Sequence, residues 1–170
     1  MTLKQCLLII TVWFSIMINR VSAHGNKPGN GSTENPIDFT LTDTSGKIVS
    51  LHDFTGKFVI ISMSAGWCKP CLAEVEPTKD LQQNLNDTNI VWLFVNFDKN
   101  AEDWAETRRL ENIKGVHLWG KPESTNLKSL FDFNSLPYYI WINKDGTLAQ
   151  KDCPRPSSRS ARGNLNLYLK

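Results

Sequence analysis

The chain has 170 residues, of which 41% are hydrophobic, with 19 Lys and Arg against 17 Asp and Glu. Residues 1–23 hold two of the basic residues, Lys4 and Arg20, and no acidic ones, so the rest of the chain is balanced at 17 of each sign. This balance provides no basic surface for nucleic acid, and we expect no nucleic-acid partner. The chain after position 23 is long enough for one domain with a single core, which we expect to be a monomer.

The first 23 residues have the pattern of an export signal. Lys4 precedes an apolar run at 7–18, and Val21-Ser-Ala23 then provides the small or aliphatic residues that a signal peptidase recognises. The run is shorter than the roughly 20 residues that a membrane-spanning helix needs. We therefore predict a cleaved signal peptide at 1–23 and a periplasmic or otherwise extracytoplasmic protein. The alternative is an uncleaved signal that anchors the chain in a membrane, because Arg20 is an unusual neighbour for a cleavage site.

The rest of the chain divides into a lead-in and a folded domain. Residues 24–35 are rich in Gly, Asn, Ser and Pro, which indicates a flexible segment, and the domain is expected at 36–170. In chain order we predict strands at 37–41 and 47–51, a loop at 52–57, a strand at 58–63, a helix at 72–85 kinked at Pro77, a strand at 89–97, an exposed amphipathic helix at 101–112, a short strand at 116–119, a short helix at 126–133, strands at 138–142 and 147–151, and a final helix at 165–169.

Turn residues and apolar runs indicate how these elements pair. Asp43-Thr-Ser-Gly46 and Asn143-Lys-Asp-Gly146 each separate two predicted strands, so each pair of strands forms a β-hairpin. The strands at 58–63 and 89–97 are apolar throughout, as expected for strands buried on both faces of a parallel sheet. The pattern predicts an α/β domain in which a βαβ unit lies between two hairpins.

Two cysteines lie where the predicted strand at 58–63 leads into a helix. In Trp67-Cys-Lys-Pro-Cys71 they are three residues apart, so they share one face of a helical turn and can close a small disulfide ring. The unpaired N–H groups and positive dipole end of the helix would stabilise a thiolate on Cys68. Because a thiolate is the form that attacks disulfides, this pattern predicts thiol–disulfide chemistry.

Other roles for the cysteines are less consistent with their placement. A structural disulfide with so short a loop would constrain the unfolded chain only weakly. A copper or zinc carrier would need a histidine near the pair, and none of the three histidines (His24, His52 and His117) has a motif-like spacing to it. Leu72 occupies the position where attachment of a c-type haem requires histidine. We therefore expect no metal and no cofactor. A binding or chaperone module with incidental cysteines is disfavoured by the placement of the pair between strand and helix.

This set of features resembles the thioredoxin superfamily, and within it the exported TlpA/ResA-like thiol–disulfide oxidoreductases, over about residues 35–151. The segments that carry the resemblance are Phe39-Thr-Leu-Thr-Asp-Thr-Ser-Gly46, Trp67-Cys-Lys-Pro-Cys71, Glu74 with Pro77, Leu136-Pro137 and Asn143-Lys-Asp-Gly146. The resemblance implies a thioredoxin-like fold, in which a central mixed β-sheet is flanked by helices and the N-terminal strands form a β-hairpin. It also implies that Pro137 is cis and stands opposite the cysteine pair.

The resemblance assigns roles to single residues. Cys68 would be the exposed nucleophile, and Cys71 the resolving thiol that attacks the mixed disulfide. Glu74 matches the acidic residue that related reductases carry three positions after the second cysteine, where it could accept or relay the proton of Cys71. Alternatively, Glu74 has no role in the reaction and lies on a solvated helix face. Trp67, Leu136 and Pro137 would bind substrate, with Pro137 presenting backbone groups to an extended segment.

The chain also departs from the thioredoxin pattern. Many thioredoxins carry a buried acid six residues before the first cysteine, and Ser62 stands there in this sequence. Proton transfer would then depend on Glu74 or water. Lys69 adds positive charge that should favour the thiolate. Cys153 lies outside the motif and is expected to be a spare thiol, with a regulatory or intermolecular disulfide as the alternative.

The predicted function is that of an exported thiol–disulfide oxidoreductase that reduces protein disulfides and is itself kept reduced by a membrane-embedded thiol electron donor. An oxidase or isomerase on the same fold is the alternative within this class, since electron flow depends on potential and partner. A copper or zinc carrier that uses the cysteine pair is the alternative from a different class.

Overall fold

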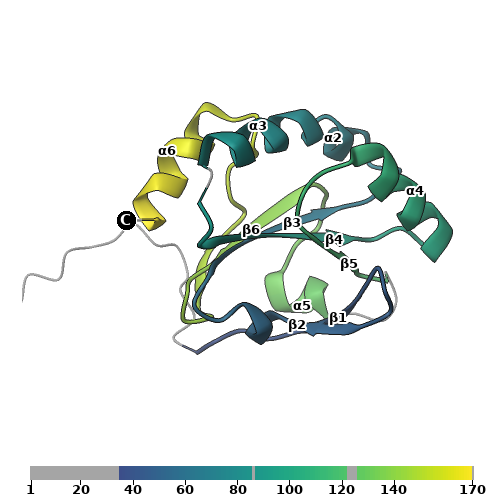
Figure 1. The fold of residues 1–170 in the computed structure, drawn as a ribbon, viewed down its shortest axis with the longest axis horizontal. Coiled ribbons are helices and arrows are strands. Elements are labelled where there is room, and N and C mark those ends of the chain that lie inside the picture. The colour runs from purple at the N-terminus through teal and green to yellow at the C-terminus, as the bar shows by residue number, and fades with distance from the viewer. Residues whose placement is uncertain (1–34, 86, 122–125, 170) are drawn as a thin grey trace, which may run out of the picture.

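The computed structural model describes residues 35–85, 87–121 and 126–169, and these residues form one mixed β-sheet with helices on both faces (Figure 1). In chain order the strands are β1 (Thr40–Asp43), β2 (Ile48–Ser50), β3 (Phe58–Ser64), β4 (Ile90–Asn96), β5 (Val116–Trp119), β6 (Tyr138–Ile142) and β7 (Leu148–Lys151). The helices are η1 (Leu51–Phe54), α2 (Lys69–Leu72), α3 (Val75–Leu85), α4 (Ala101–Glu111), α5 (Leu127–Phe131) and α6 (Arg159–Tyr168).

The sheet has the order β2-β1-β5-β4-β3-β6-β7 within the described residues. Strands β3, β4 and β5 are parallel, and the remaining neighbours are antiparallel. Both predicted hairpins are present, as β1–β2 and β6–β7. The predicted mixed sheet flanked by helices, with an N-terminal hairpin, is therefore confirmed.

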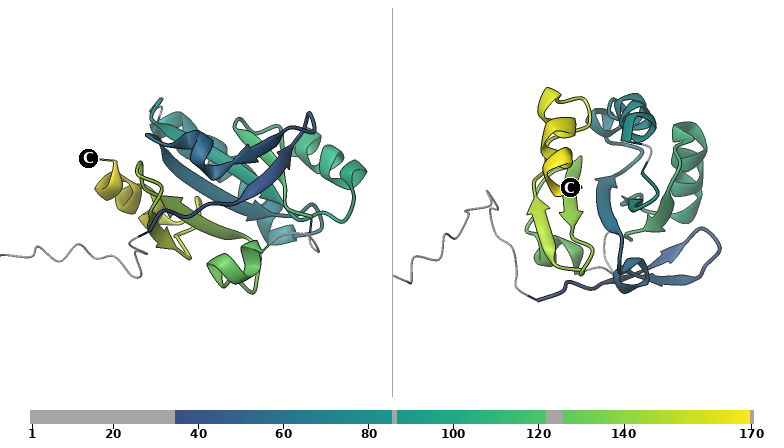
Figure 2. Two further views of the ribbon diagram at one scale, coloured as in Figure 1. Left: turned by 90° about the horizontal axis from the view of Figure 1, so that it is seen from below. Right: turned by 60° about the vertical axis from the view of Figure 1, so that its left-hand side comes forward.

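Alternate residues of β3 pack into two separate clusters, because successive side chains of a strand point to opposite faces. Val59, Ile61 and Met63 join the cluster on the face that α5 covers. Phe58 and Ile60 join the other cluster, which is covered by α3 and α6. Figure 2 shows α3 and α6 side by side over one face, with α5 on the opposite side of the sheet. All seven β3 residues are buried, as the apolar run predicts for a central strand.

Several element boundaries differ from the sequence-based expectation. The helix predicted at 72–85 is two helices, and the break lies between α2 and α3 rather than at Pro77. Pro77 is the third residue of α3. Backbone N–H groups in the first turn of a helix have no partner inside the helix, so proline, which lacks an N–H, does not disrupt it there. The final helix begins at Arg159 rather than at 165, because Ser158 caps its N-terminus by accepting a hydrogen bond from the Ser160 N–H.

Smaller differences occur near the N-terminal hairpin. The first strand begins at Thr40 instead of 37, and its hydrogen-bonded register pairs Thr40 with Ser50. The predicted loop at 52–57 overlaps the 3-10 helix η1, which Ser50 and Asp53 close with a capping box. The predicted signal peptide at 1–23 and all but the last residue of the lead-in at 24–35 lie outside the described residues. None of the helices in the described part of the chain is long and apolar enough to cross a lipid bilayer.

Candidate active site

The two motif cysteines lie where β3 ends and α2 begins, and they form a disulfide with their Cα atoms 5.2 Å apart. Cys68 is the N-cap residue of α2, and the backbone N–H of Cys71 donates a hydrogen bond to its Sγ atom at 3.2 Å. In the reduced protein the same N–H group would stabilise a thiolate on Cys68. The pair is therefore placed as a redox-active pair requires.

The residues around the disulfide differ sharply in exposure. Trp67 is 66% exposed and presents a large apolar surface beside the pair. Cys68, expected to be exposed, is only 5% exposed in this oxidised state, because it packs with Ala65, Phe97 and Leu136. The disulfide is therefore largely buried beside an exposed aromatic side chain.

Leu136 and Pro137 lie close to the pair although they are far away in sequence. Strand β6 pairs with β3 so that Tyr138 stands opposite Met63, which puts the preceding Pro137 beside the carboxyl end of β3. The peptide bond between Leu136 and Pro137 is cis. Pro137 also borders a surface cavity of about 530 Å³, whose other side is formed by the segment that contains Arg155.

The backbone just before Trp67 is held by a buried carboxylate that the sequence analysis did not single out. Asp98 is 2% exposed and accepts hydrogen bonds from the Gly66 N–H and the Thr107 hydroxyl, both at 2.9 Å. A Cβ atom at Gly66 would overlap the Thr107 hydroxyl oxygen, so no other residue fits there without displacing that side chain. Asp98 follows the carboxyl end of β4, the parallel neighbour of β3. Its position directly after a parallel strand is the sequence feature from which it could have been predicted.

A small polar cavity of about 20 Å³ lies behind Cys71, on the side of the sheet that α3 covers. Besides Cys71, two carboxyl side chains and four hydroxyl side chains border it. Its lining residues are Ser62, Ser64, Cys71, Glu74, Val75, Thr78, Phe94, Glu111, Ile113 and Tyr139. The volume is sufficient for one water molecule. The cavity therefore offers a short polar path for a proton next to the inner cysteine.

Glu74 lies in this cavity and not on a solvated helix face. It is only 6% exposed, and both of its carboxylate oxygens accept hydrogen bonds from Ser157. The Ser157 N–H donates to Oε2 at 2.9 Å and the Ser157 hydroxyl donates to Oε1 at 2.7 Å. The contact of Ser157 with Glu74 spans 83 positions in the sequence.

Glu111 is the second carboxyl group of the cavity, and sequence reasoning missed it. Burial, and then the charge of Asp98, raise the pKa of Glu111 to about 7, which Lys79 partly offsets. None of the described residues donates a hydrogen bond to its carboxyl group. A signal was present, because Glu111 follows Trp104 by seven positions and Thr107 by four, and these spacings place all three on one buried face of α4.

The position of the buried acid in many thioredoxins is occupied by a buried serine. Ser62 is 6% exposed and lines the cavity together with Tyr139. Burial, and then the charge of Glu74, raise the pKa of Tyr139 above its ordinary value, so the phenol stays protonated. Ser62 and Tyr139 can pass a proton on, but neither is a carboxylate that would hold it.

Cys153 lies away from the pair in an apolar cluster under α6. It is 5% exposed, and its thiol donates a hydrogen bond to the Gln150 carbonyl at 3.3 Å. Burial raises the pKa of this thiol well above its usual range. These surroundings agree with the expected spare thiol.

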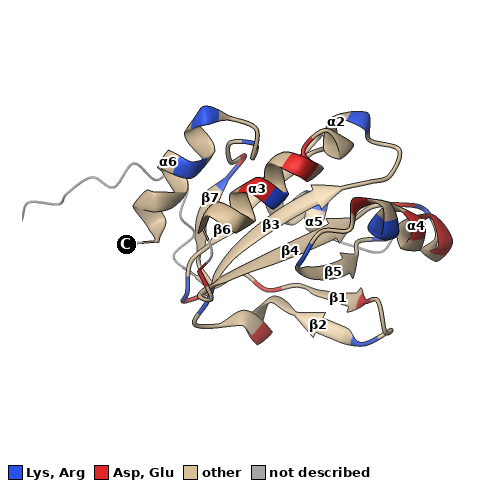
Figure 3. Ribbon diagram, turned by 45° about the horizontal axis from the view of Figure 1, so that its top comes forward, with Lys and Arg blue, Asp and Glu red and all other residues tan. Residues whose placement is uncertain are grey.

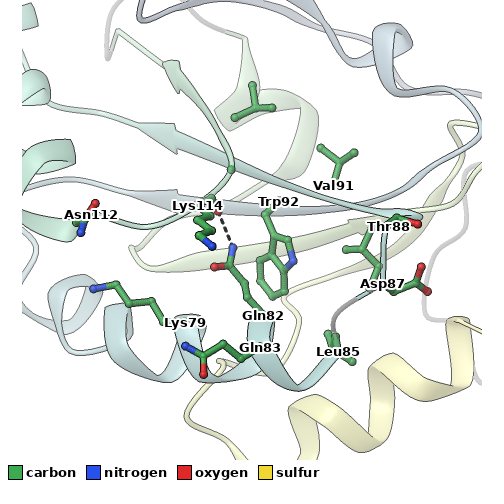
Figure 4. Close-up of a pocket in the computed structure, with 13 residues that line it drawn as sticks. Lys79, Gln82, Gln83, Leu85, Asp87, Thr88, Val91, Trp92, Asn112 and Lys114 are labelled. Atoms are coloured by element: carbon green, nitrogen blue, oxygen red, sulfur yellow. Dashed lines mark hydrogen bonds between the residues drawn. The ribbon is translucent and has the colours of Figure 1, made fainter.

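A larger cavity, of about 570 Å³, lies at the opposite end of β4 from the disulfide. It opens between α3 and the segments that lead into β4 and β5, and Figure 4 shows Trp92 and Gln82 in it. The Gln82 amide donates a hydrogen bond to the Lys114 carbonyl at 2.6 Å, which joins its two sides (Figure 4). No cysteine borders this cavity, so it is not the redox site.

Charged residues of both signs lie on the helices of the described part of the chain. Figure 3 shows acidic and basic residues together on α4, with basic residues on α6 and at the start of α2. Within the part of the chain that the structure describes, no three His, Cys, Asp or Glu side chains come close enough to hold a metal ion.

Comparisons with known proteins agree with this geometry. Residues 33–151 match the model of the AhpC/TSA family. The thiol-disulfide oxidoreductase ResA of Bacillus thuringiensis is 31% identical over 136 residues, which cover 78% of this chain and 73% of that protein. The thioredoxin-like protein YneN of Bacillus subtilis is 42% identical over 71 residues, covering 42% of this chain and 41% of its own.

Solved structures show the same fold. A provisionally assigned thiol-disulfide oxidoreductase of Bacteroides vulgatus superposes with a TM-score of 0.73 at 27% identity, over 82% of this chain and 97% of that one. The thioredoxin domain of a second thiol-disulfide oxidoreductase of that organism has a TM-score of 0.72 at 18% identity, covering 83% and 99% of the two chains. The second likeness, at so low an identity, concerns the fold alone.

Proposed function

Because this chain belongs to the AhpC/TSA family and is a thiol–disulfide oxidoreductase of thioredoxin fold, we propose that it is exported and reduces disulfides of other proteins. The observation that carries the proposal is the Cys68–Cys71 disulfide at the start of α2, beside Pro137. A pair in this position can exchange its disulfide with that of a bound segment.

The reaction begins with the reduced pair. The Cys68 thiolate, stabilised by the Cys71 N–H, attacks one sulphur of the substrate disulfide, and the other substrate sulphur leaves as a thiolate. Cys71 then loses its proton and attacks the Cys68 sulphur. The Cys68–Cys71 bond forms, the mixed disulfide breaks, and the second substrate thiolate is released. Two electrons have passed from the cysteine pair to the substrate.

Substrate is proposed to bind in extended form across Pro137. Backbone groups just before a strand can form hydrogen bonds with an extended segment that lies beside them. Trp67 supplies exposed apolar surface on one side of the disulfide, and Leu136 packs against the pair from the other. This arrangement favours unfolded or flexible protein segments over small disulfides.

Glu74 is proposed to support the second step. Its carboxyl group shares the small cavity with Cys71, and its two hydrogen bonds from Ser157 hold it in position there. A negative charge on it would stabilise a proton that leaves Cys71 into the cavity.

Export and electron supply complete the proposal. The apolar run at 7–18 and the small residues that end at Ala23 support export to the periplasm or another extracytoplasmic compartment. A membrane-embedded dithiol would reduce the Cys68–Cys71 disulfide after each turnover. The domain would act as a monomer.

The direction of electron flow is tested by the equilibrium reduction potential of the pair against glutathione. We expect a value near that of thioredoxin, about −270 mV. A value near about −120 mV would instead identify the protein as an oxidant and overturn the proposed direction.

The roles of the cysteines are tested by two substitutions. We expect Cys68→Ser to abolish turnover of a disulfide-bonded protein substrate, and Cys71→Ser to accumulate a mixed disulfide with that substrate, seen as an added mass under non-reducing conditions. Cys153→Ser is the matched control and should retain turnover, since Cys153 lies in a separate cluster. Full reductase activity in both motif variants would contradict the proposed function.

A further inference from the structure

The second step of the proposed reaction needs a group that takes the proton of Cys71, and this inference rests on that reaction. Ser62 stands where many thioredoxins carry an acid, so the strand itself supplies no carboxylate. The cavity behind Cys71 does contain carboxyl groups, and they come from two other elements: Glu74 from the junction of α2 and α3, and Glu111 from the end of α4.

The two carboxyl groups differ in what surrounds them. Both oxygens of Glu74 already accept hydrogen bonds from Ser157. Glu111 is 8% exposed and lacks such donors among the described residues, so burial disfavours its charge. A carboxyl group in these surroundings can change its protonation state near neutral pH, as a general base for a thiol must.

The charged and titratable groups around Glu111 come from every element packed on it. They are Asp98 after β4, Lys79 on α3, Glu74 before α3, Tyr139 on β6, Cys71 on α2, Arg108 on its own helix and His117 on β5. His117 stacks on the cavity residue Phe94, and burial lowers the pKa of its imidazole, so it is neutral at pH 7. The charge of Asp98 disfavours a carboxylate at Glu111, while the charge of Lys79 favours it.

We propose that Glu111 accepts the proton of Cys71 through the small cavity during resolution of the mixed disulfide. The Cys71 S–H bond breaks, and its proton passes by one water molecule or the Ser62 hydroxyl to the Glu111 carboxylate. The Cys71 sulphur then forms the bond to Cys68 Sγ, and the substrate sulphur leaves with the electron pair of the broken mixed disulfide. When an external dithiol reduces the Cys68–Cys71 disulfide, protonated Glu111 returns a proton to the departing Cys71.

The attack by Cys68 and the resolution by Cys71 can be followed separately, because each releases a coloured thiol. The reduced full-length protein is mixed with a symmetrical aromatic disulfide whose released thiol is coloured. Attack by Cys68 releases one equivalent and resolution by Cys71 releases the second. In the unmodified protein the rate of the second phase should rise with pH through about 7, as Glu111 becomes ionised.

In Glu111→Gln we expect the second phase at neutral pH to slow by about 10²-fold, the lower end of what a positioned general base supplies. Its rise should move to alkaline pH, where the Cys71 thiol ionises unaided. The first phase should be unchanged. Glu106→Gln is the matched control, because Glu106 lies on the same helix with its side chain 67% exposed.

The outcomes distinguish the two proposals. A normal first phase with an unchanged second phase and pH profile in Glu111→Gln would overturn the role of Glu111 alone. Loss of the first phase in the unmodified protein would instead overturn the proposed function.

A second measurement does not depend on the variant folding. In the unmodified protein labelled with ¹³C at glutamate carboxyl carbons, one resonance of the oxidised form should titrate near pH 7 and change its midpoint on reduction of the pair. Titration of every glutamate with a midpoint below about 5 in both redox states would also overturn the role of Glu111.

Discussion

The two buried sulphur sites of this domain, at Cys71 and at Cys153, have the same exposure but opposite surroundings. The two residues are 4% and 5% exposed. Cys71 borders a polar cavity with two carboxyl groups at the carboxyl end of the parallel strands. Cys153 lies in an apolar cluster with Trp141 and Leu165, where the Gln150 carbonyl accepts the hydrogen bond of its thiol.

The comparison shows that burial alone does not determine what a thiol does. A buried thiol without a proton acceptor remains protonated and inert, and it acts as a small apolar side chain. A buried thiol next to a carboxyl group can be deprotonated at the moment its partner needs it. We expect the reactivity of the two sites to differ for this reason.

The largest expected effect is on alkylation of the reduced protein. At neutral pH, Cys68 should react with iodoacetamide at least about 10³-fold faster than Cys153, because the Cys68 thiolate is stabilised while Cys153 reacts only on transient opening. Peptide mass spectrometry over a time course measures both rates. Reaction of Cys153 at a rate comparable to Cys68 would contradict the expected difference between the motif cysteines and Cys153. In urea, which unfolds the protein, the difference between the two rates should disappear.

A smaller effect is expected on stability against pH at the Cys71 site. The pKa of Glu111 is raised to about 7 in the folded state, so its protonated form contributes stability fully below its unfolded value of 4.5, and this contribution is lost as pH rises towards 7. Glu111→Gln should therefore raise the free energy of unfolding at pH 8 by up to about 3 kcal/mol and change it little at pH 4. Urea unfolding at both pH values measures this difference.

The matched variant for that experiment is Glu106→Gln, whose exposed carboxyl group should give no such pH-dependent gain. An equal free energy of unfolding for Glu111→Gln and the unmodified protein at pH 8 would mean that the cavity does not penalise the Glu111 charge.

The smallest effect is expected where the C-terminal loop meets the cavity. Ser157→Ala removes the hydroxyl donor to Glu74 and leaves the backbone donor, so the free energy of unfolding should fall by about 1–2 kcal/mol. Ser129→Ala, at an exposed position on α5, serves as the control in the same urea titration. If both variants unfold alike, the Ser157 hydroxyl contributes nothing measurable to holding Glu74.

Much of the fold could be predicted from local pattern. The strands at 116–119 and 138–142 have the predicted bounds, and both hairpins follow from turn residues with Gly46 and Gly146 at positive φ. The boundaries that were wrong depend on details that periodicity does not contain. The break before Val75 is one example, because a helical pattern continues through it, and the early start of α6 at the Ser158 cap is another.

Apart from Leu136 and Pro137, which the family resemblance supplied, the candidate site was predictable only where its residues are adjacent in sequence. Trp67, Cys68 and Cys71 form one motif, and the position of Glu74 follows from its spacing to them. Asp98 and Glu111 are ordinary acidic residues until β4 and α4 place them against the cysteine loop.

The sequence by itself determined the cysteine pair, its position between a strand and a helix, and the order of elements that makes a thioredoxin-like sheet. These features depend on neighbours within a few residues, whose spacing sets local hydrogen bonding and side-chain direction. Only the tertiary structure decided which carboxyl groups stand behind Cys71. The contact of Ser157 with Glu74 joins residues 83 positions apart, and the burial that raises the pKa of Glu111 exists only once α4 has packed on the sheet.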